Sequence, residues 1–147
     1  MMAKWSVWTD GSSYGNPGPS GCGYQIQLYR KVVAYGFKPL GVATNNVAEY
    51  AGIEAALLKV LEFEKKPKSA RVVVRTDSEL IVRQLKGEYA VRSKDLKPYY
   101  KRLKAVADKF LKVKFIHIRR DKNEVADFLA NQGSLISAKR EANLSNG

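Results

Sequence analysis

The order of the strand-like and helix-like segments most constrains what this chain can fold into. Three strand-like runs rich in aromatic and β-branched residues come first, at positions 5–10, 23–29 and 31–38. The short break at Arg30 predicts a hairpin between the second and third runs. After a first helix, strands and helices alternate, at 70–76, 113–118 and the segments around them. This order is typical of an α/β domain, with a mixed sheet and helices on both faces.

Helical spacing of apolar residues predicts the rest of the secondary structure. The first helix is expected to start at Asn45 or Asn46, one of which would be its N-cap, and to run to about Glu64. A short helix follows Asp77 and stops at Gly87, and a third helix is expected at 94–110.

The last helix is predicted at 123–136, with Val125, Phe128 and Leu129 facing the core. The segment 137–147 is polar, and we expect a frayed tail there. The predicted domain is therefore 1–136, followed by that tail.

The charge of the chain favours a polyanionic partner. Its 26 Lys and Arg residues exceed its 14 Asp and Glu residues and give a formal charge of +12. Such an excess most often indicates nucleic acid, and the alternative is a protein that is basic only for solubility. The single cysteine, Cys22, cannot form an internal disulfide or a cysteine-based zinc site. No apolar run approaches the roughly 18 residues needed to cross a bilayer, and no secretory signal is apparent. We therefore expect a cytoplasmic protein without a membrane partner. A monomer is the simplest expected state.

Four acidic residues stand at the ends of predicted elements. Asp10 ends the first strand, Asp77 follows the strand at 70–76, and Glu49 and Asp127 lie near the starts of the first and last helices. If the two strands are parallel neighbours, all four acids reach the sheet edge where α/β sheets bind ligands. Each acid alone is more simply explained as a helix-capping residue or a favourable charge in a first turn.

Together, the four acids would repel one another unless cations neutralised them. Oxygen-only ligands suit Mg²⁺, with Mn²⁺ as the alternative. Two such ions about 4 Å apart activate a water and stabilise the leaving oxygen of a phosphodiester. A basic surface around such a pocket would attract the phosphate backbone.

Four segments around these acids resemble the signatures of type 1 ribonuclease H. They are 9–21 (TDGSSYGNPGPSG), 44–50 (TNNVAEY), 76–78 (TDS) and 123–130 (NEVADFLA). They occur in the family's order and span 5–131, nearly the whole chain. The resemblance implies a ribonuclease-H-like fold with a five-stranded mixed sheet whose first three strands are antiparallel. It also implies cleavage of the RNA strand of RNA–DNA hybrids by two Mg²⁺ ions, leaving 3′-hydroxyl and 5′-phosphate ends.

The resemblance also implies roles for individual residues. The metal ligands would be Asp10, Glu49, Asp77 and Asp127. The residues that contact the hybrid would come from the glycine-rich segment and the start of the first helix: Gly11, Ser12, Asn16, Thr44, Asn45 and Asn46. The wide minor groove of such duplexes displays the 2′-hydroxyl groups that distinguish RNA from DNA, and short amides both donate to and accept from them.

The chain departs from the family pattern in two places. Many members carry a histidine in a loop before the last acid, whereas here that connection is short and holds Arg119 and Arg120. We expect Arg120 or Arg119 to act near the phosphate, the alternative being a solvated basic loop, and we expect His117 to be structural. The segment 87–95 is also too short for the family's basic protrusion.

Two other functions are compatible with the sequence. A hybrid-binding module without activity would lack one of the acids, and all four are present. A resolvase or transposase core of the same fold usually has other acid spacings and larger additions. The intact Asn16 and the segment 44–46 favour the RNA–DNA hybrid as substrate.

Overall fold

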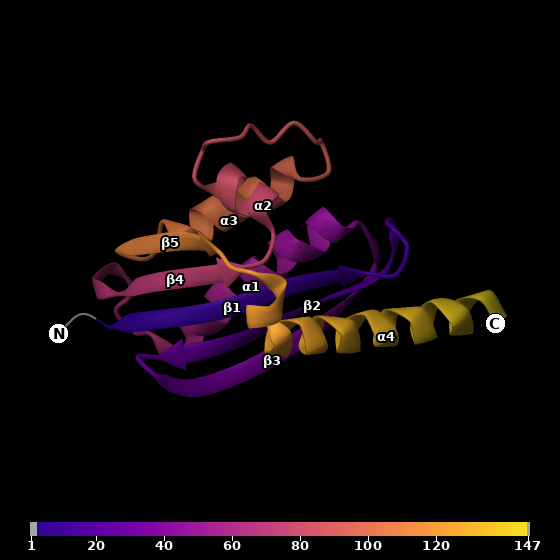
Figure 1. Ribbon diagram of the computed structural model, residues 1–147, viewed down its shortest axis with the longest axis horizontal. Helices are drawn as coiled ribbons and strands as arrows, with labels where there is room; N and C mark the ends of the chain where they lie inside the picture. Colours follow the sequence, from indigo (N-terminus) through magenta and orange to yellow (C-terminus); the bar gives the residue numbers. More distant parts are fainter. Residues whose placement is uncertain (1–2, 147) are drawn as a thin grey trace.

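The computed structural model describes residues 3–146 and contains one five-stranded sheet (Figure 1). The strands follow the order β3-β2-β1-β4-β5. β1 pairs antiparallel with β2, β2 pairs antiparallel with β3, and β4 and β5 continue the sheet parallel to β1. The predicted fold is therefore confirmed. The strands are β1 (Lys4–Ser13), β2 (Gly18–Leu28), β3 (Lys31–Ala43), β4 (Arg71–Thr76) and β5 (Lys112–His117).

Helices cover both faces of the sheet. On one face lie α1 (Asn45–Phe63), α2 (Glu79–Leu85) and α3 (Lys97–Ala107), and α4 (Glu124–Asn146) crosses the opposite face (Figure 1). Two short 3₁₀ turns, η1 (Pro67–Ser69) and η2 (Arg120–Lys122), precede β4 and α4. None of the described helices is long and apolar enough to cross a bilayer.

The main core lies between the sheet and the first three helices. Strand residues alternate between the two faces, so Val7 of β1 and Val72 and Val74 of β4 point toward α1 and are almost fully buried. The largest apolar side chains that complete this core are Ile26, Tyr50, Ile53, Leu57, Ile81 and Leu103.

Most of the glycine-rich segment 9–21 belongs to strands, and the first strand extends beyond its predicted end at position 10. β1 runs through Gly11 to Ser13 and β2 begins at Gly18, so only four residues form the turn. Gly11 lies in the strand because α1 passes very close to it. A Cβ built on Gly11 would lie 2.4 Å from the backbone nitrogen of Glu49. The glycine therefore brings the start of α1 against the end of β1, where Asp10 lies.

The inward face of α4 differs from the prediction. Val125 and Phe128 are 43% and 60% exposed, and Leu129 is only partly buried. The buried face instead consists of small residues, namely Ala126, Ala130, Gly133, Ser134 and Ser137. Small side chains are required because the helix lies directly on the β2 backbone. A Cβ on Gly23 would be 2.5 Å from the backbone nitrogen of Ala130.

The predicted end of α4 was also wrong. The helix continues through the expected frayed tail to Asn146, and the predicted domain boundary at 136 falls inside it. Ser137 is buried on the side of α4 that faces the sheet, and its hydroxyl donates to the carbonyl of Ser20 at 2.6 Å. It also accepts from the backbone N–H groups of Leu40 and Gly41. A polar residue thus continues the packed face, which hydrophobic periodicity does not detect.

Candidate active site

Three of the four acids meet at one edge of the sheet. Asp10 lies near the end of β1, Asp77 directly follows β4, and Glu49 lies in the second turn of α1. Each offers a carboxylate oxygen, and these oxygens lie within 4.8 Å of one another. They converge because β1 and β4 are parallel neighbours whose carboxyl ends share an edge.

Asp127 approaches the same place from the opposite face of the sheet. It lies in the first turn of α4, and its charge raises the pKa values of both Asp10 and Asp77. All four acids line one cleft of about 360 Å³. The cleft is completed by polar residues and backbone from β1, α1, η2 and α4, namely Gly11, Ser12, Ser13, Asn45, Arg120 and Asn131.

Burial makes these carboxylates hard to ionise. Desolvation is the largest cause that raises the pKa of Asp10, to about 7, and neighbouring Asp77 and Asp127 raise it further. Glu49 is 8% exposed, and burial together with the charge of Asp10 raises its pKa well above the usual range. The pKa of Asp77 is raised as well, again chiefly by burial. Such a cluster is costly as free anions, and a cation would remove that cost.

The donor set fits a divalent metal that prefers oxygen. It contains carboxylates only, so it does not resemble a structural zinc site, which uses cysteine and histidine. Two hydrogen bonds fix Glu49: the hydroxyl of Thr76 donates to its Oε2 at 3.2 Å, and the backbone N–H of Gly11 also donates to this carboxylate. Glu49 is therefore held in place from β1 and β4.

Of the residues expected to contact the substrate, Gly11, Ser12 and Asn45 line the cleft with the acids, whereas Thr44 lines a separate hollow. Thr44, not Asn45 or Asn46, is the N-cap of α1, because its Oγ1 accepts from the backbone N–H of Val47 at 3.3 Å. The side chain of Asn45 is thereby free of the capping role and lines the cleft. Asn16 lies against it, since Asn16 Oδ1 accepts from the backbone N–H of Asn45 at 3.0 Å.

The structure distinguishes the two arginines before α4. Arg120 lines the cleft, and its Nη2 lies 3.9 Å from Asp127 Oδ1. Arg119 instead faces Asp121, at 3.6 Å. His117, expected to be structural, ends β5 with an exposed side chain, and its charge lowers the pKa of Asp77. It therefore lies close enough to influence the site electrostatically.

Asn131 is a site residue that the sequence did not indicate. It lies one helical turn after Asp127, and its Nδ2 donates to the Asp127 carbonyl at 3.0 Å and approaches Oδ1 at 3.5 Å. Its own Oδ1 accepts from the hydroxyl of Ser12 at 3.0 Å. Asn131 thus connects Asp127 to β1. The i, i+4 spacing from Asp127 was the available signal.

Asn123 connects the start of α4 to β1 through a buried hydrogen bond. It is 1% exposed, and its Nδ2 donates to the carbonyl of Thr9 at 2.8 Å. A hydrogen bond from this amide also lowers the pKa of Asp77. The asparagine four residues before the last acid therefore fixes where α4 begins relative to the acids.

Comparison with known proteins gives a consistent result. The model of a family described as reverse transcriptase-like matches residues 9–133. The bifunctional protein Rv2228c of Mycobacterium tuberculosis is 36% identical over 135 residues, which are 90% of this chain and 36% of that protein. The ribonuclease HI of Halobacterium salinarum is 36% identical over 84% of this chain and 60% of its own length. The chain thus spans between about a third and three fifths of these relatives.

Solved structures share the fold closely. The N-terminal RNase H domain of Rv2228c superposes with a TM-score of 0.87 at 33% identity, covering 95% of this chain and 99% of that domain. RNase H1 of Halobacterium salinarum gives 0.82 at 34% identity, covering 88% and 96%. LC11-RNase H1, solved in complex with an RNA/DNA hybrid, gives 0.83 at 37% identity, covering 87% and 94%.

Proposed function

This chain belongs to the type 1 ribonuclease H family, and on that premise we propose that it hydrolyses the RNA strand of RNA–DNA hybrids with two divalent metal ions. The convergence of Asp10, Glu49 and Asp77, the first two of them buried, with Asp127 in the same cleft, carries the proposal. The hybrid bound to LC11-RNase H1, which is 37% identical, supports the choice of substrate.

Asp10, Glu49, Asp77 and Asp127 would hold the metal ions. Bound there, two ions would supply an activated water and charge stabilisation for the leaving oxygen. We propose Mg²⁺ as the ion, with Mn²⁺ as the alternative, because the ligands are all carboxylates. Cleavage would leave 3′-hydroxyl and 5′-phosphate ends.

We propose that residues in and beside the cleft orient the substrate. Asn16, Thr44, Asn45 and Asn46, with the backbone of Gly11 and Ser12, lie on the side of the acids where β1 meets α1. We propose that they contact 2′-hydroxyls and phosphates of the hybrid. The guanidinium of Arg120 is largely exposed at the rim beside Asp127, and we assign it to the scissile phosphate.

The test presents one labelled sequence as an RNA–DNA hybrid, duplex RNA, duplex DNA and single-stranded RNA, each with Mg²⁺ and with EDTA. We expect metal-dependent cleavage of the RNA strand in the hybrid. Tight hybrid binding without cleavage under Mg²⁺ or Mn²⁺ would instead identify a hybrid-binding module. Analytical ultracentrifugation tests whether the protein is a monomer in solution. The monomeric state and the cytoplasmic location stay predictions.

A further inference from the structure

The sheet face on the α4 side is covered only in part. α4 packs on β1, β2 and β3, and among the described residues no helix packs on this side of β4 and β5 (Figure 1). The core valines Val72 and Val74 point the other way, so alternation places Arg71 and Arg75 on the uncovered side.

The uncovered side is strongly basic. The strand register places Lys4 beside Arg71, Trp8 beside Arg75, and Arg71 beside Lys112. We define the open face as Lys4, Trp8, Arg71, Arg75, Lys112 and Lys114. No acidic residue alternates with them on β1 before Asp10 or on β4 and β5. Within the described part of the chain, none of the five cations lies within 4.0 Å of a carboxylate.

Arg75 and Trp8 form a platform at the centre of the open face. The guanidinium carbon lies 4.7 Å from the centroid of the indole ring. Its Nη1 is shielded from solvent and has no hydrogen-bond partner among the described residues. An arginine held over an aromatic ring presents a positive charge beside an aromatic surface, where a phosphate and a base can bind together.

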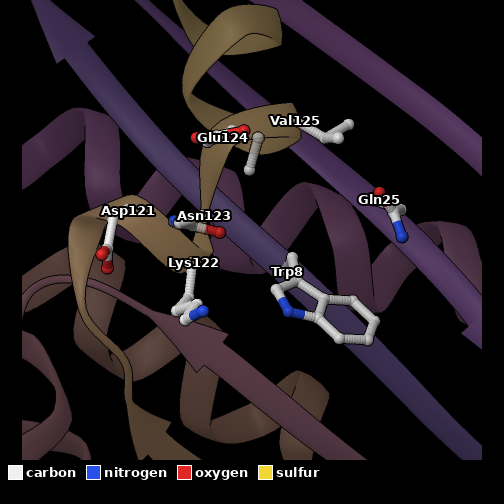
Figure 2. A pocket seen from close by; sticks show the side chains of 8 residues that line it. Trp8, Gln25, Asp121, Lys122, Asn123, Glu124 and Val125 are labelled. Carbon is white, nitrogen blue, oxygen red and sulfur yellow. The ribbon is translucent and has the colours of Figure 1, made fainter.

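Three hollows join across this face. One of about 460 Å³ reaches from Arg71 to Lys112 and Lys114, and a second of about 520 Å³ lies over Trp8 and Arg75. They share Lys4, and the second shares Trp8 with a third hollow of about 240 Å³ below the start of α4. In this third hollow the indole of Trp8 is accompanied by Lys122 and by two acidic residues, Asp121 and Glu124 (Figure 2). The three hollows together form a trough.

We propose that the open face binds single-stranded nucleic acid, with phosphates on the five cations and a base stacked at the Trp8–Arg75 platform. The cluster of positive charges without carboxylate partners favours a polyanion. An acidic peptide would satisfy the charges but would leave the aromatic platform and the hollows unused. Proteins that bind single strands combine a basic groove with aromatic rings on which bases stack. The proposal does not depend on hybrid cleavage at the cleft.

The affinity test uses a fluorescein-labelled 20-nucleotide oligothymidylate, followed by anisotropy in EDTA. Lys112→Gln/Lys114→Gln removes two charges from the open face, and Lys139→Gln/Arg140→Gln removes two exposed charges from α4 as the control. We expect the first variant to lose at least fivefold in affinity and to flatten the salt slope by about 1.4, at ~0.7 per phosphate contact. The control should lose less than twofold. Equal losses in the two variants would overturn the proposal.

The stacking test uses tryptophan fluorescence. Trp5 is 3% exposed in the core, whereas Trp8 is half-buried on the open face, so oligothymidylate should quench Trp8 alone. Trp8→Leu should lose the quench while its melting curve shows a folded protein. Competition by polyglutamate as strong as that by unlabelled oligothymidylate would assign the face to acidic peptides instead. The Lys112/Lys114 variant should still cut a blunt-ended hybrid within twofold of wild type, which separates this result from a failure of the proposed activity.

Discussion

At the scale of single residues, Asp10 gives the sharpest test of the metal site. Asp10→Asn keeps the size of the side chain and removes a negative ligand, so we expect Mg²⁺-dependent cleavage to fall by at least about 1,000-fold. Hybrid binding in EDTA should stay within about threefold, because the surrounding basic surface is unchanged. A gel assay of hybrid cleavage measures the first effect and anisotropy the second. A variant that cuts at the wild-type rate would contradict the metal assignment.

The same carboxylate predicts how metal-free stability depends on pH. Burial raises the pKa of folded Asp10 to about 7, from 3.8 in the unfolded chain. The folded state therefore binds this proton more tightly, and the stabilising contribution, complete below about pH 4, is lost as pH rises through 7. In EDTA, Asp10→Asn should unfold at nearly the wild-type urea midpoint at pH 4.5. At pH 8 it should be more stable by on the order of 2 kcal/mol.

Mg²⁺ provides the control for this pH effect. It should raise the midpoint of the wild type at pH 8 and have much less effect on Asp10→Asn. If the two proteins keep a constant difference in stability between pH 4.5 and 8, the raised pKa of Asp10 is not the cause.

Arg120 tests the rim of the cleft. Arg120→Ala should lower kcat about tenfold or more if its guanidinium acts at the phosphate. Arg119→Ala is the matched control, because Arg119 faces Asp121 rather than the cleft, and it should change kcat less than twofold. Equal kcat values for the two variants would leave Arg120 as a surface charge.

The four acids were proposed as a site because acidic residues stand at the ends of predicted elements. Residues that position other side chains were missed. The convergence of Asp10 and Asp77 could be predicted because both lie near the carboxyl ends of their strands, and parallel neighbouring strands share an edge. Asn131 was missed, since its i, i+4 spacing from Asp127 predicts a contact but gives it no role in the site until Ser12 is placed beside it. The predicted N-cap of α1 was wrong for a related reason. Threonine and asparagine are both good N-caps, so only the backbone conformation decides among Thr44, Asn45 and Asn46.

At the scale of elements, α4 shows how close packing overrides hydrophobic pattern. Ala130→Leu would force a large side chain between α4 and the Gly23 backbone, and we expect a loss of about 2–3 kcal/mol in unfolding free energy. Phe128 is 60% exposed on another side of α4, so Phe128→Leu should change the unfolding free energy by less than about 0.5 kcal/mol. Urea unfolding measures both. A larger loss for Phe128→Leu would mean that the helix packs on its aromatic face, as the sequence pattern suggested.

That pattern misled because amphipathic periodicity assumes bulky residues inside. Here α4 lies directly on the glycines of β2, so only small residues fit between the helix and the strand, and Ala126, Ala130 and Gly133 are the buried ones. The helix end was missed likewise, since Ser137 is buried by hydrogen bonds to two strands rather than by apolar contact. The order of the elements was predicted correctly because each helix or strand was recognised from the spacing of apolar residues within its own segment.

At the scale of the whole molecule, the order of segments predicted a mixed sheet with helices on both faces, and the family resemblance added that its first three strands are antiparallel. The open face required coordinates. Alternation predicts that Arg71 and Arg75 share a side of β4, but not whether a helix covers that side. That depends on where α4 crosses, and it crosses β1 to β3 only. The net charge of +12 was visible in the sequence, and its uneven distribution was not.

This charge predicts strong salt dependence for hybrid binding, because each phosphate neutralised releases counterions. Five contacts would give a slope of about −4.5 in log K against log salt, and thus a roughly 500-fold loss of affinity between 50 and 200 mM KCl. Anisotropy with a blunt-ended hybrid in EDTA measures the slope, and melting curves at both salt concentrations confirm that the protein stays folded. A slope shallower than about −2 would mean that few cations reach the backbone. Binding would then rest on the asparagines and backbone of the cleft, and the excess charge would serve other surfaces, the open face first among them.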